Sequence, residues 1–251
     1  MPTPDRGAGS GAAPSPRDGL ADWLARAGRA VQNGKSLDTA LPAGAAGLLG
    51  LDVLCLAAVA RGGSLELLWC DPTAGLGPEL DNLQYSLGDG PTWEAAYESR
   101  LLIEPDLAAA DPARWPAFLP AAVHTAARAV IAAPLQLGVA AIGVLTGYRS
   151  APGSLTKDQL VDFHRLRRAL LLLLLRTALG DPVRSNGAGA GLRLYRADVH
   201  QATGFLSAEL GIPASRALLL LRAHATAHDQ DLSDLAHALL SRRMPPDTLD
   251  L

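Results

Sequence analysis

Residues 51–71, LDVLCLAAVARGGSLELLWCD, decide the fold of this chain because they hold two short apolar runs on either side of a glycine pair. Such a pattern predicts two antiparallel strands joined by a hairpin. If Gly62 and Gly63 form the loop, Cys55 lies directly opposite Cys70. Directly opposed residues of two strands are about 4.5–5.5 Å apart, within reach of a disulfide.

The two cysteines allow two interpretations. As an oxidised pair they make a redox switch in the hairpin, whereas as reduced thiols they are small buried hydrophobic residues. Two cysteines are too few for the disulfide framework of a small secreted protein. We therefore favour reduced thiols in a reducing cytoplasm.

Similar patterns extend the hairpin into a sheet flanked by helices. Apolar runs of strand length predict strands at residues 51–60, 64–71, 101–104, 128–137 and 140–148, the last two joined by a tight turn at Gly138. Helical spacing of apolar residues predicts helices at 20–32, 37–49, 77–99 with a break at 88–91, 115–127 and 156–179. Helices and antiparallel strands of this order define an α+β domain with one central sheet.

A glycine-rich stretch, GDPVRSNGAGAG at residues 180–191, divides the chain. Beyond it, helices at 199–210, after Pro213 and at 232–243 predict a small all-α bundle with no strand. We therefore expect a disordered tail at 1–19, the α+β domain at 20–180, a linker at 181–191, the helical bundle at 192–244 and a C-terminal tail at 245–251.

Composition excludes one class of function. With 25 acidic and 22 basic side chains and a net charge of -3, the chain cannot coat nucleic acid or an anionic membrane by bulk attraction. The most apolar segment, residues 169–175, is far shorter than the about 20 residues that cross a bilayer, and residues 1–19 lack the apolar stretch of a signal peptide. We expect a cytoplasmic protein without a membrane segment.

The helix expected at 156–179 contains an unbroken run of leucines at 170–175, which makes it apolar on all sides. Such a helix needs partners on more than one face. One face would pack on the sheet of its own domain. We expect the other to meet a second copy of the chain in a homodimer and to conduct a signal to the helical bundle, the alternative being a helix buried wholly in its own domain.

The sequence lacks the common catalytic motifs. It has no G-x-S-x-G elbow, no G-x-x-x-x-G-K-[ST] phosphate loop, no H-E-x-x-H and no G-x-G-x-x-G after a strand. His224 and His228 lie one helical turn apart, but no carboxylate or cysteine pattern completes a metal site around them. We expect no enzyme activity, metal or cofactor, and a solvated histidine pair that titrates near neutral pH.

The helical bundle resembles ANTAR domains. The resemblance rests on VHQATG at 199–204, LGI at 210–212, Ala217, the pair Leu221-Arg222, Ala225, and Leu232 with Leu235-Ala236. It implies a three-helix bundle that binds hairpins in nascent RNA and prevents transcription termination, commonly as a dimer.

The ANTAR resemblance also implies an RNA-facing surface. Its positions correspond here to Gln201, Ala202, Thr203, Gly204, Arg222 and Ala225, to which position and side-chain chemistry add His200 and His228. Most members carry Lys where this chain has Thr203. One phosphate-directed cation is therefore missing, which lowers the expected affinity for RNA and its salt dependence.

Residues 20–180 resemble GAF domains through LQYSLGDGP at 83–91, RWPAF at 114–118 and IGVL at 142–145. The resemblance implies a central antiparallel sheet with helices on both sides and a ligand cavity on one. Members often have Cys after the Gly-Pro pair where this chain has Thr92, so a thiol-based sensor is not expected. Five aromatic residues are candidates to line the cavity, although aromatics also suit an ordinary core: Trp69, Tyr85, Trp93, Trp115 and Phe118.

Together the two resemblances imply a signal-dependent transcription regulator. A sensor domain would respond to an unidentified small molecule or partner and control an RNA-binding bundle that grips hairpin loops. The competing interpretation is a dimeric ligand sensor or protein-interaction module whose near-neutral tail does not bind RNA. Salt dependence separates the two, because phosphate contacts weaken with salt and apolar contacts do not.

Overall fold

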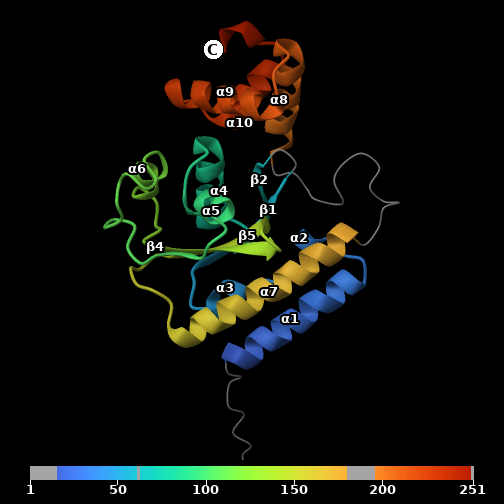
Figure 1. The fold of residues 1–251 in the computed structure, drawn as a ribbon, viewed down its shortest axis with the longest axis vertical. Helices are drawn as coiled ribbons and strands as arrows, with labels where there is room; N and C mark the ends of the chain where they lie inside the picture. Colours follow the sequence, from blue (N-terminus) through green and yellow to red (C-terminus); the bar gives the residue numbers. More distant parts are fainter. Residues whose placement is uncertain (1–15, 61–62, 180–195, 250–251) are drawn as a thin grey trace, which may run out of the picture.

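The computed structural model describes residues 16–60, 63–179 and 196–249. Residues 16–179 form a sheet domain, and residues 196–249 form a C-terminal helical segment that lies against it (Figure 1). The linker expected at 181–191 lies outside the described residues, as does most of the tail expected at 1–19. Residues 16–19 instead belong to the first helix.

The centre of the sheet domain is a five-stranded, wholly antiparallel sheet in the order β2-β1-β5-β4-β3. Its strands are β1 (Val53–Val59), β2 (Leu65–Asp71), β3 (Leu102–Glu104), β4 (Ala129–Leu137) and β5 (Ala140–Arg149). All five were expected from their apolar runs. Successive residues of β1 alternate between two cores, Leu54 and Leu56 on one face and Cys55 and Ala57 on the other, as the two-residue period of a strand requires.

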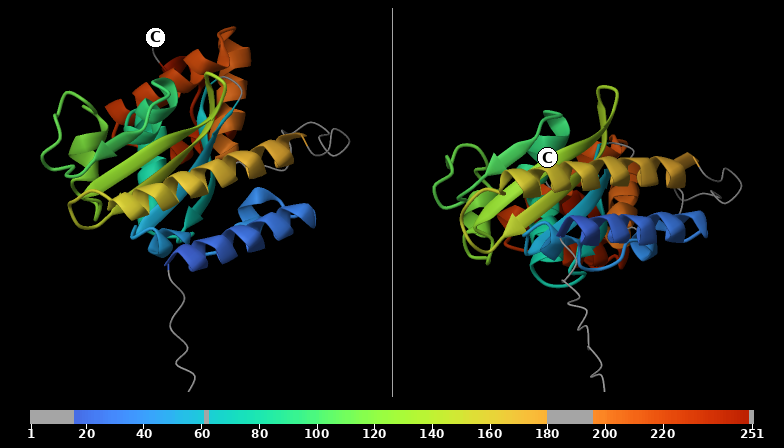
Figure 2. Two further views of the ribbon diagram at one scale, coloured as in Figure 1. Left: turned by 60° about the horizontal axis from the view of Figure 1, so that its bottom comes forward. Right: turned by 90° about the horizontal axis from the view of Figure 1, so that it is seen from below.

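Helices cover both faces of the sheet, which is the architecture that the resemblance to GAF domains implied. One face carries α1 (Pro16–Gln32) and α7 (Lys157–Leu179), which lie side by side, together with the short α2 (Leu37–Ala40) and α3 (Ala45–Leu48) (Figure 2). The other face carries α4 (Leu76–Leu87), α5 (Pro91–Tyr97) and α6 (Phe118–Ala122). The layers bury two separate cores, one on each face of the sheet.

Two expected helices are much shorter than the apolar spacing predicted. The segment 37–49 forms only the single turns α2 and α3, because Pro42 cannot donate to the carbonyl four residues earlier and Gly44 adopts a φ of 97°. The segment 115–127 is helical only at α6. An earlier start would need an N–H from Pro120, which has none.

The β1–β2 hairpin confirms the predicted pairing of Cys55 with Cys70, but its loop length and register differ from those predicted. Ala60 pairs with Ser64, so the loop has three residues and not two. The extra residue Leu68 in β2 then shifts the register by one and brings the cysteines opposite each other. The expectation of reduced thiols is wrong in this structure, which holds a disulfide between them.

The C-terminal segment consists of α8 (Ala197–Leu210), α9 (Ala214–Ala227), α10 (Leu232–Leu240) and a short 3-10 turn, η1 (Pro246–Thr248). As expected, α8 ends at Gly211, which has a φ of 63°, and Pro213 precedes α9. The side chain of Asp231 caps α10. This helix ends at Leu240, before the expected Arg243, since Arg242 adopts a left-handed backbone.

The segment has its own core, formed by apolar side chains of its three helices, and Tyr85 of α4 joins that core from the sheet domain. In the described part of the chain no single helix has the length and hydropathy to span a membrane. The pair α8 and α9 passes such a test together, but it is bent by 110°.

Candidate functional site

A cavity of about 410 Å³ opens beside α5, between that helix and the segment that leads into α6. Its lining combines aromatic rings with charged groups: Gly88, Asp89, Gly90, Trp93, Glu94, Tyr97, Glu98, Arg100, Arg114 and Trp115. With five charged side chains and three aromatic rings, this lining offers ion-pair partners and ring faces to a small polar molecule.

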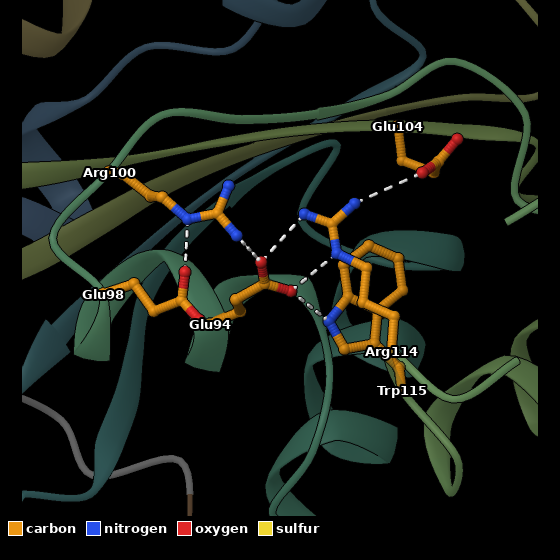
Figure 3. Close-up of polar contacts among 6 residues, drawn as sticks. All are labelled: Glu94, Glu98, Arg100, Glu104, Arg114 and Trp115. Carbon is orange, nitrogen blue, oxygen red and sulfur yellow. Dashed lines mark hydrogen bonds and ion pairs between the residues drawn. The ribbon is translucent and has the colours of Figure 1, made fainter. Parts of the chain in front are cut away.

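Glu94 organises the wall of this cavity (Figure 3). Its carboxylate accepts two hydrogen bonds from Arg114, at 2.8 and 2.9 Å, and a third from the indole N–H of Trp115 at 2.7 Å. Arg100 pairs with the same carboxylate and with Glu98. The result is a network that joins α5 to the chain 20 residues further on.

The electrostatics of the network favour the charged forms. Burial by itself raises the pKa of Glu94, but the hydrogen bonds and charge of Arg114, with smaller contributions from Trp115 and Arg100, outweigh it and lower the pKa below 4.5. The hydrogen bond to Glu94 raises the pKa of Arg114 in turn. The network is therefore a fixed ion cluster at neutral pH.

Gln84 holds α5 in place behind the cavity. Its amide oxygen accepts from the backbone N–H of Thr92 at 2.8 Å, and its amide nitrogen donates to the hydroxyl of Tyr148 at 2.8 Å. Its backbone carbonyl accepts from the indole of Trp93 at 3.0 Å. Thr92 in addition contacts the hydroxyl of Thr146 at 3.0 Å. In this chain the GAF-like stretch 83–91 thus has a structural role, joining α4, α5 and β5.

The five aromatic residues expected at a ligand cavity do not lie together. Only Trp93 and Trp115 line the cavity beside α5. Phe118 is buried edge-on against the Trp115 ring, with centroids 6.2 Å apart. Trp69 belongs to the core on the other face of the sheet, next to Trp23, and Tyr85 lies under the C-terminal segment. Sequence order alone does not tell which face of the sheet a side chain occupies.

A second polar cluster joins the sheet domain to the C-terminal segment. Arg196 donates to Asp81 at 2.6 Å and to Asn82 at 3.3 Å, and its guanidinium lies 4.1 Å from the centroid of the Tyr85 ring. The imidazole of His200 lies 3.0 Å from the carboxylate of Glu66 in β2. We call these residues, together with Arg222, the docking cluster: Glu66, Asp81, Asn82, Tyr85, Arg196, His200 and Arg222.

Arg222 of α9 lies between two aromatic rings of the sheet domain. Its guanidinium carbon is 4.9 Å from the ring centroid of Tyr85 and 5.1 Å from that of Trp93, distances at which a cation is attracted to the ring face. Burial lowers the pKa of Arg222 and, on the other side of the contact, raises the pKa of Tyr85 to about 12. Burial also raises the pKa of Asp81, while the charge of Arg196 opposes that effect.

The cavity and the docking cluster share a wall. Trp93 lines the cavity and also contacts Arg222. A Cβ placed on Gly88, another lining residue, would stand 3.3 Å from a terminal nitrogen of Arg222. A group that enters the cavity and moves α5 or the 88–90 turn would therefore act directly on the contact with α9.

The residues expected to face RNA are divided between the surface and the interior. Gln201, Gly204 and His228 are exposed. Ala202, Thr203 and Ala225 are buried, and the hydroxyl of Thr203 donates to the carbonyl of Val199 at 2.7 Å, so Thr203 points into the bundle. His200 and Arg222 are partly buried at the docking cluster. In this conformation the eight residues do not form one open surface.

Sequence reasoning missed the carboxylates that hold these sites together. Glu94, Glu66 and Asp81 carry no local motif, and apart from Arg100 the partners named here lie 20 or more residues away along the chain. The sequence gives one weak indication, at Glu66. It is an acidic residue in the middle of an apolar strand, and a charged side chain is rarely buried unless it has a partner.

No group of three or more His, Cys, Asp or Glu residues is arranged to hold a metal ion in the described ranges 16–60, 63–179 and 196–249. The rings of His224 and His228 stack with centroids 4.0 Å apart, and Nδ1 of His228 lies 2.9 Å from the carbonyl of His224. The pair is therefore joined by stacking and a backbone contact.

Neither the models of known protein families nor the curated proteins contain a match to this chain. Among solved structures, the phycocyanobilin-bound GAF domain of a cyanobacterial phytochrome is 15% identical with a TM-score of 0.49, over 65% of this chain and 97% of that one. The GAF domain of an Acinetobacter phosphoenolpyruvate-protein phosphotransferase is 16% identical with a TM-score of 0.47, over 64% and 96%.

An enzyme is similar to the same extent. The free methionine-R-sulfoxide reductase of Neisseria meningitidis, in complex with its substrate, is 17% identical with a TM-score of 0.46, over 65% of this chain and 92% of that one.

Proposed function

We propose that this chain is a signal-dependent regulator in the cytoplasm. In it, a GAF-type sensor domain, residues 16–179, binds a small molecule and controls an ANTAR-type segment, residues 196–249, which binds hairpins in nascent RNA and prevents transcription termination. The sensor does no catalysis.

One observation carries the proposal: Trp93 lines the cavity and also contacts Arg222 of the C-terminal segment, and a Cβ placed on Gly88, another lining residue, would stand 3.3 Å from Arg222. A sensor needs a place for a ligand and a physical connection to its output. Here a single short helix, α5, supplies both. The order of the ANTAR-like residues along α8, α9 and α10 supports the assignment of the output to RNA.

The competing function is a protein-interaction module without RNA binding. The buried Thr203 and the partly buried Arg222 favour it, because neither presents a polar group to RNA in this conformation. The charge of the tail favours the same function. Residues 190–251 contain six arginines and seven acidic residues, so the tail has no excess of positive charge to attract RNA.

A binding titration separates the two functions. We expect a two-hairpin RNA to bind the full chain with an affinity that falls as salt rises, because phosphate contacts release counterions. Gln201→Ala should weaken binding about fivefold, the effect of one lost hydrogen bond of about 1 kcal/mol. Glu209→Ala, at another exposed position of α8, is the matched control. Equal binding by both variants, or equal binding of an unrelated RNA, contradicts the proposal.

We further propose that two copies associate through α7 and so bring two RNA-binding segments together. Leu172 supports this, since its side chain is 61% exposed in the middle of the leucine run. Leu170, Leu173 and Leu174 of the same run are buried in the sheet domain's core, and Leu171 packs against that core.

A further inference from the structure

We infer that the sheet domain has a docking surface for the RNA-facing side of its own C-terminal segment, so that docking and RNA binding exclude each other. The inference rests on the proposed RNA-binding function and adds its regulation. The surface consists of Glu66 on β2, Asp81 and Tyr85 on α4, and Trp93 on α5.

The chemistry of the docking surface favours cations. It presents two carboxylates and two aromatic ring faces, and charges and ring quadrupoles of this kind attract guanidinium and imidazolium groups. All four side chains are buried or nearly so under the C-terminal segment, with Glu66 only 2% exposed. A carboxylate is rarely buried to that degree unless it has a cationic partner.

The C-terminal segment supplies three matching groups. Arg196 donates to Asp81, Arg222 lies over Tyr85 and Trp93, and the imidazole of His200 lies 3.0 Å from the carboxylate of Glu66 without a hydrogen bond between them. They come from the start of α8 and the middle of α9, which meet the sheet domain on the same side (Figure 1). Two of them, His200 and Arg222, belong to the RNA-facing set. An RNA phosphate and the docking surface therefore compete for the same groups.

Some buried polar groups at this contact have no hydrogen-bond partner in the described part of the chain, which lowers the free energy needed to separate the two parts. Arg222 has two buried nitrogens, Nε and Nη2, that make no hydrogen bond within the described residues, and the buried hydroxyl of Tyr85 also has no partner there. Buried polar groups without partners oppose docking, because water would satisfy them in the released state. A cavity of about 550 Å³ between α4 and the α9–α10 turn leaves another part of the interface unfilled.

The test uses the full chain and residues outside the RNA-facing set. Asp81→Asn on the sheet domain and Arg196→Gln on the C-terminal segment each remove one side of the same ion pair. Each should release the segment and tighten binding of the two-hairpin RNA by about 5- to 150-fold, the usual range of coupling between two sites. The double variant should bind no tighter than the stronger single variant, because both act on one contact. Asp22→Asn on α1, on the far face of the sheet, is the control.

Small-angle X-ray scattering of the same variants reports docking without RNA, through an increase in the radius of gyration. Released segments together with tighter RNA binding support the inference. RNA binding of equal strength in all variants contradicts the inference alone. Released segments that bind no RNA contradict the proposed function and the inference with it. An unchanged radius of gyration in both single variants shows that the ion pair does not hold the segment, and overturns the inference as well.

Discussion

At the scale of single residues, buried polar side chains decide the geometry of the candidate site. Gln84 makes three hydrogen bonds beyond its own helix, two by its side chain and one by its backbone carbonyl, and the Glu94 carboxylate accepts four, from Arg100, Arg114 and Trp115. Gln84 is fully buried and neutral, whereas Glu94 is charged and its side chain is 12% exposed. The first fixes the position of α5, and the second fixes the side chains around the cavity.

Replacement of Glu94 by Gln should lower the free energy of unfolding by about 2 kcal/mol at pH 7, because hydrogen bonds to a charged group are lost. The pKa of Glu94 is lowered in the folded chain, so its contribution is present above the unfolded pKa and disappears as the pH falls through the folded one. Urea titrations should therefore show the difference between wild type and Glu94→Gln shrinking as the pH is lowered below 4.5.

The matched control for Glu94 is Glu98→Gln. Glu98 pairs with Arg100 as well, but its side chain is 51% exposed, so we expect a loss of less than about 1 kcal/mol. Equal losses in the two variants at pH 7, or a difference between wild type and Glu94→Gln that does not change with pH, would show that the carboxylate network does not stabilise the fold.

At the scale of elements, the β1–β2 hairpin is the best determined part of the sheet domain. Its strands alternate between the two cores, and its disulfide lies under α4, where a Cβ on Gly77 would stand 3.0 and 3.1 Å from the two sulfur atoms. A side chain larger than hydrogen at Gly77 would push α4 away from the sheet, so this glycine allows the helix to pack on the disulfide.

Reduction of the disulfide should lower the free energy of unfolding by about 3 kcal/mol, the loop-entropy value for a closed loop of about 15 residues. Urea unfolding of the wild type with and without dithiothreitol measures this difference. The double variant Cys55→Ala, Cys70→Ala should not respond to the reductant. A wild type that does not respond either would mean that the thiols are reduced in solution.

At the scale of the whole molecule, the layers form a sequence from one side to the other: α1 with α7, the sheet, α4 with α5, and then the C-terminal segment (Figures 1 and 2). The exposed side of α7 therefore lies at one end and the docking cluster at the opposite end. Along that exposed side, Val161 and Leu172 lie with the exposed arginines Arg165, Arg168 and Arg176, of which Arg165 pairs with Asp162 on the same helix.

If two copies associate through α7, Leu172→Glu should convert the dimer to a monomer without loss of the fold, because a charge would be buried in an apolar contact. Sedimentation velocity measures the change, and circular dichroism checks the fold. Leu219→Glu is the matched control, since that leucine is 62% exposed on α9. If neither substitution changes the sedimentation coefficient, α7 is not the interface.

Local patterns in the sequence were sufficient for every strand and for the three helices of the C-terminal segment, whereas the cysteines pair as predicted only because the bulge at Leu68 offsets the longer hairpin loop. They failed at 37–49 and 115–127, where proline removed backbone hydrogen bonds that the apolar spacing had suggested. Of the candidate site, Trp93 and Trp115 could be named, but the position of Glu94 between two arginines could not. That position depends on where separate segments meet.

Strand periodicity, turn glycines and the order of helices and strands are properties of neighbouring residues, and for these the chain's own sequence was enough. Which aromatic rings meet, which face of the sheet holds a cavity, and whether Arg222 is open or covered depend on contacts between residues far apart, such as Asp81 and Arg196 at a separation of 115. Only the tertiary structure decided these, because burial and the pairing of charges arise when distant segments pack together.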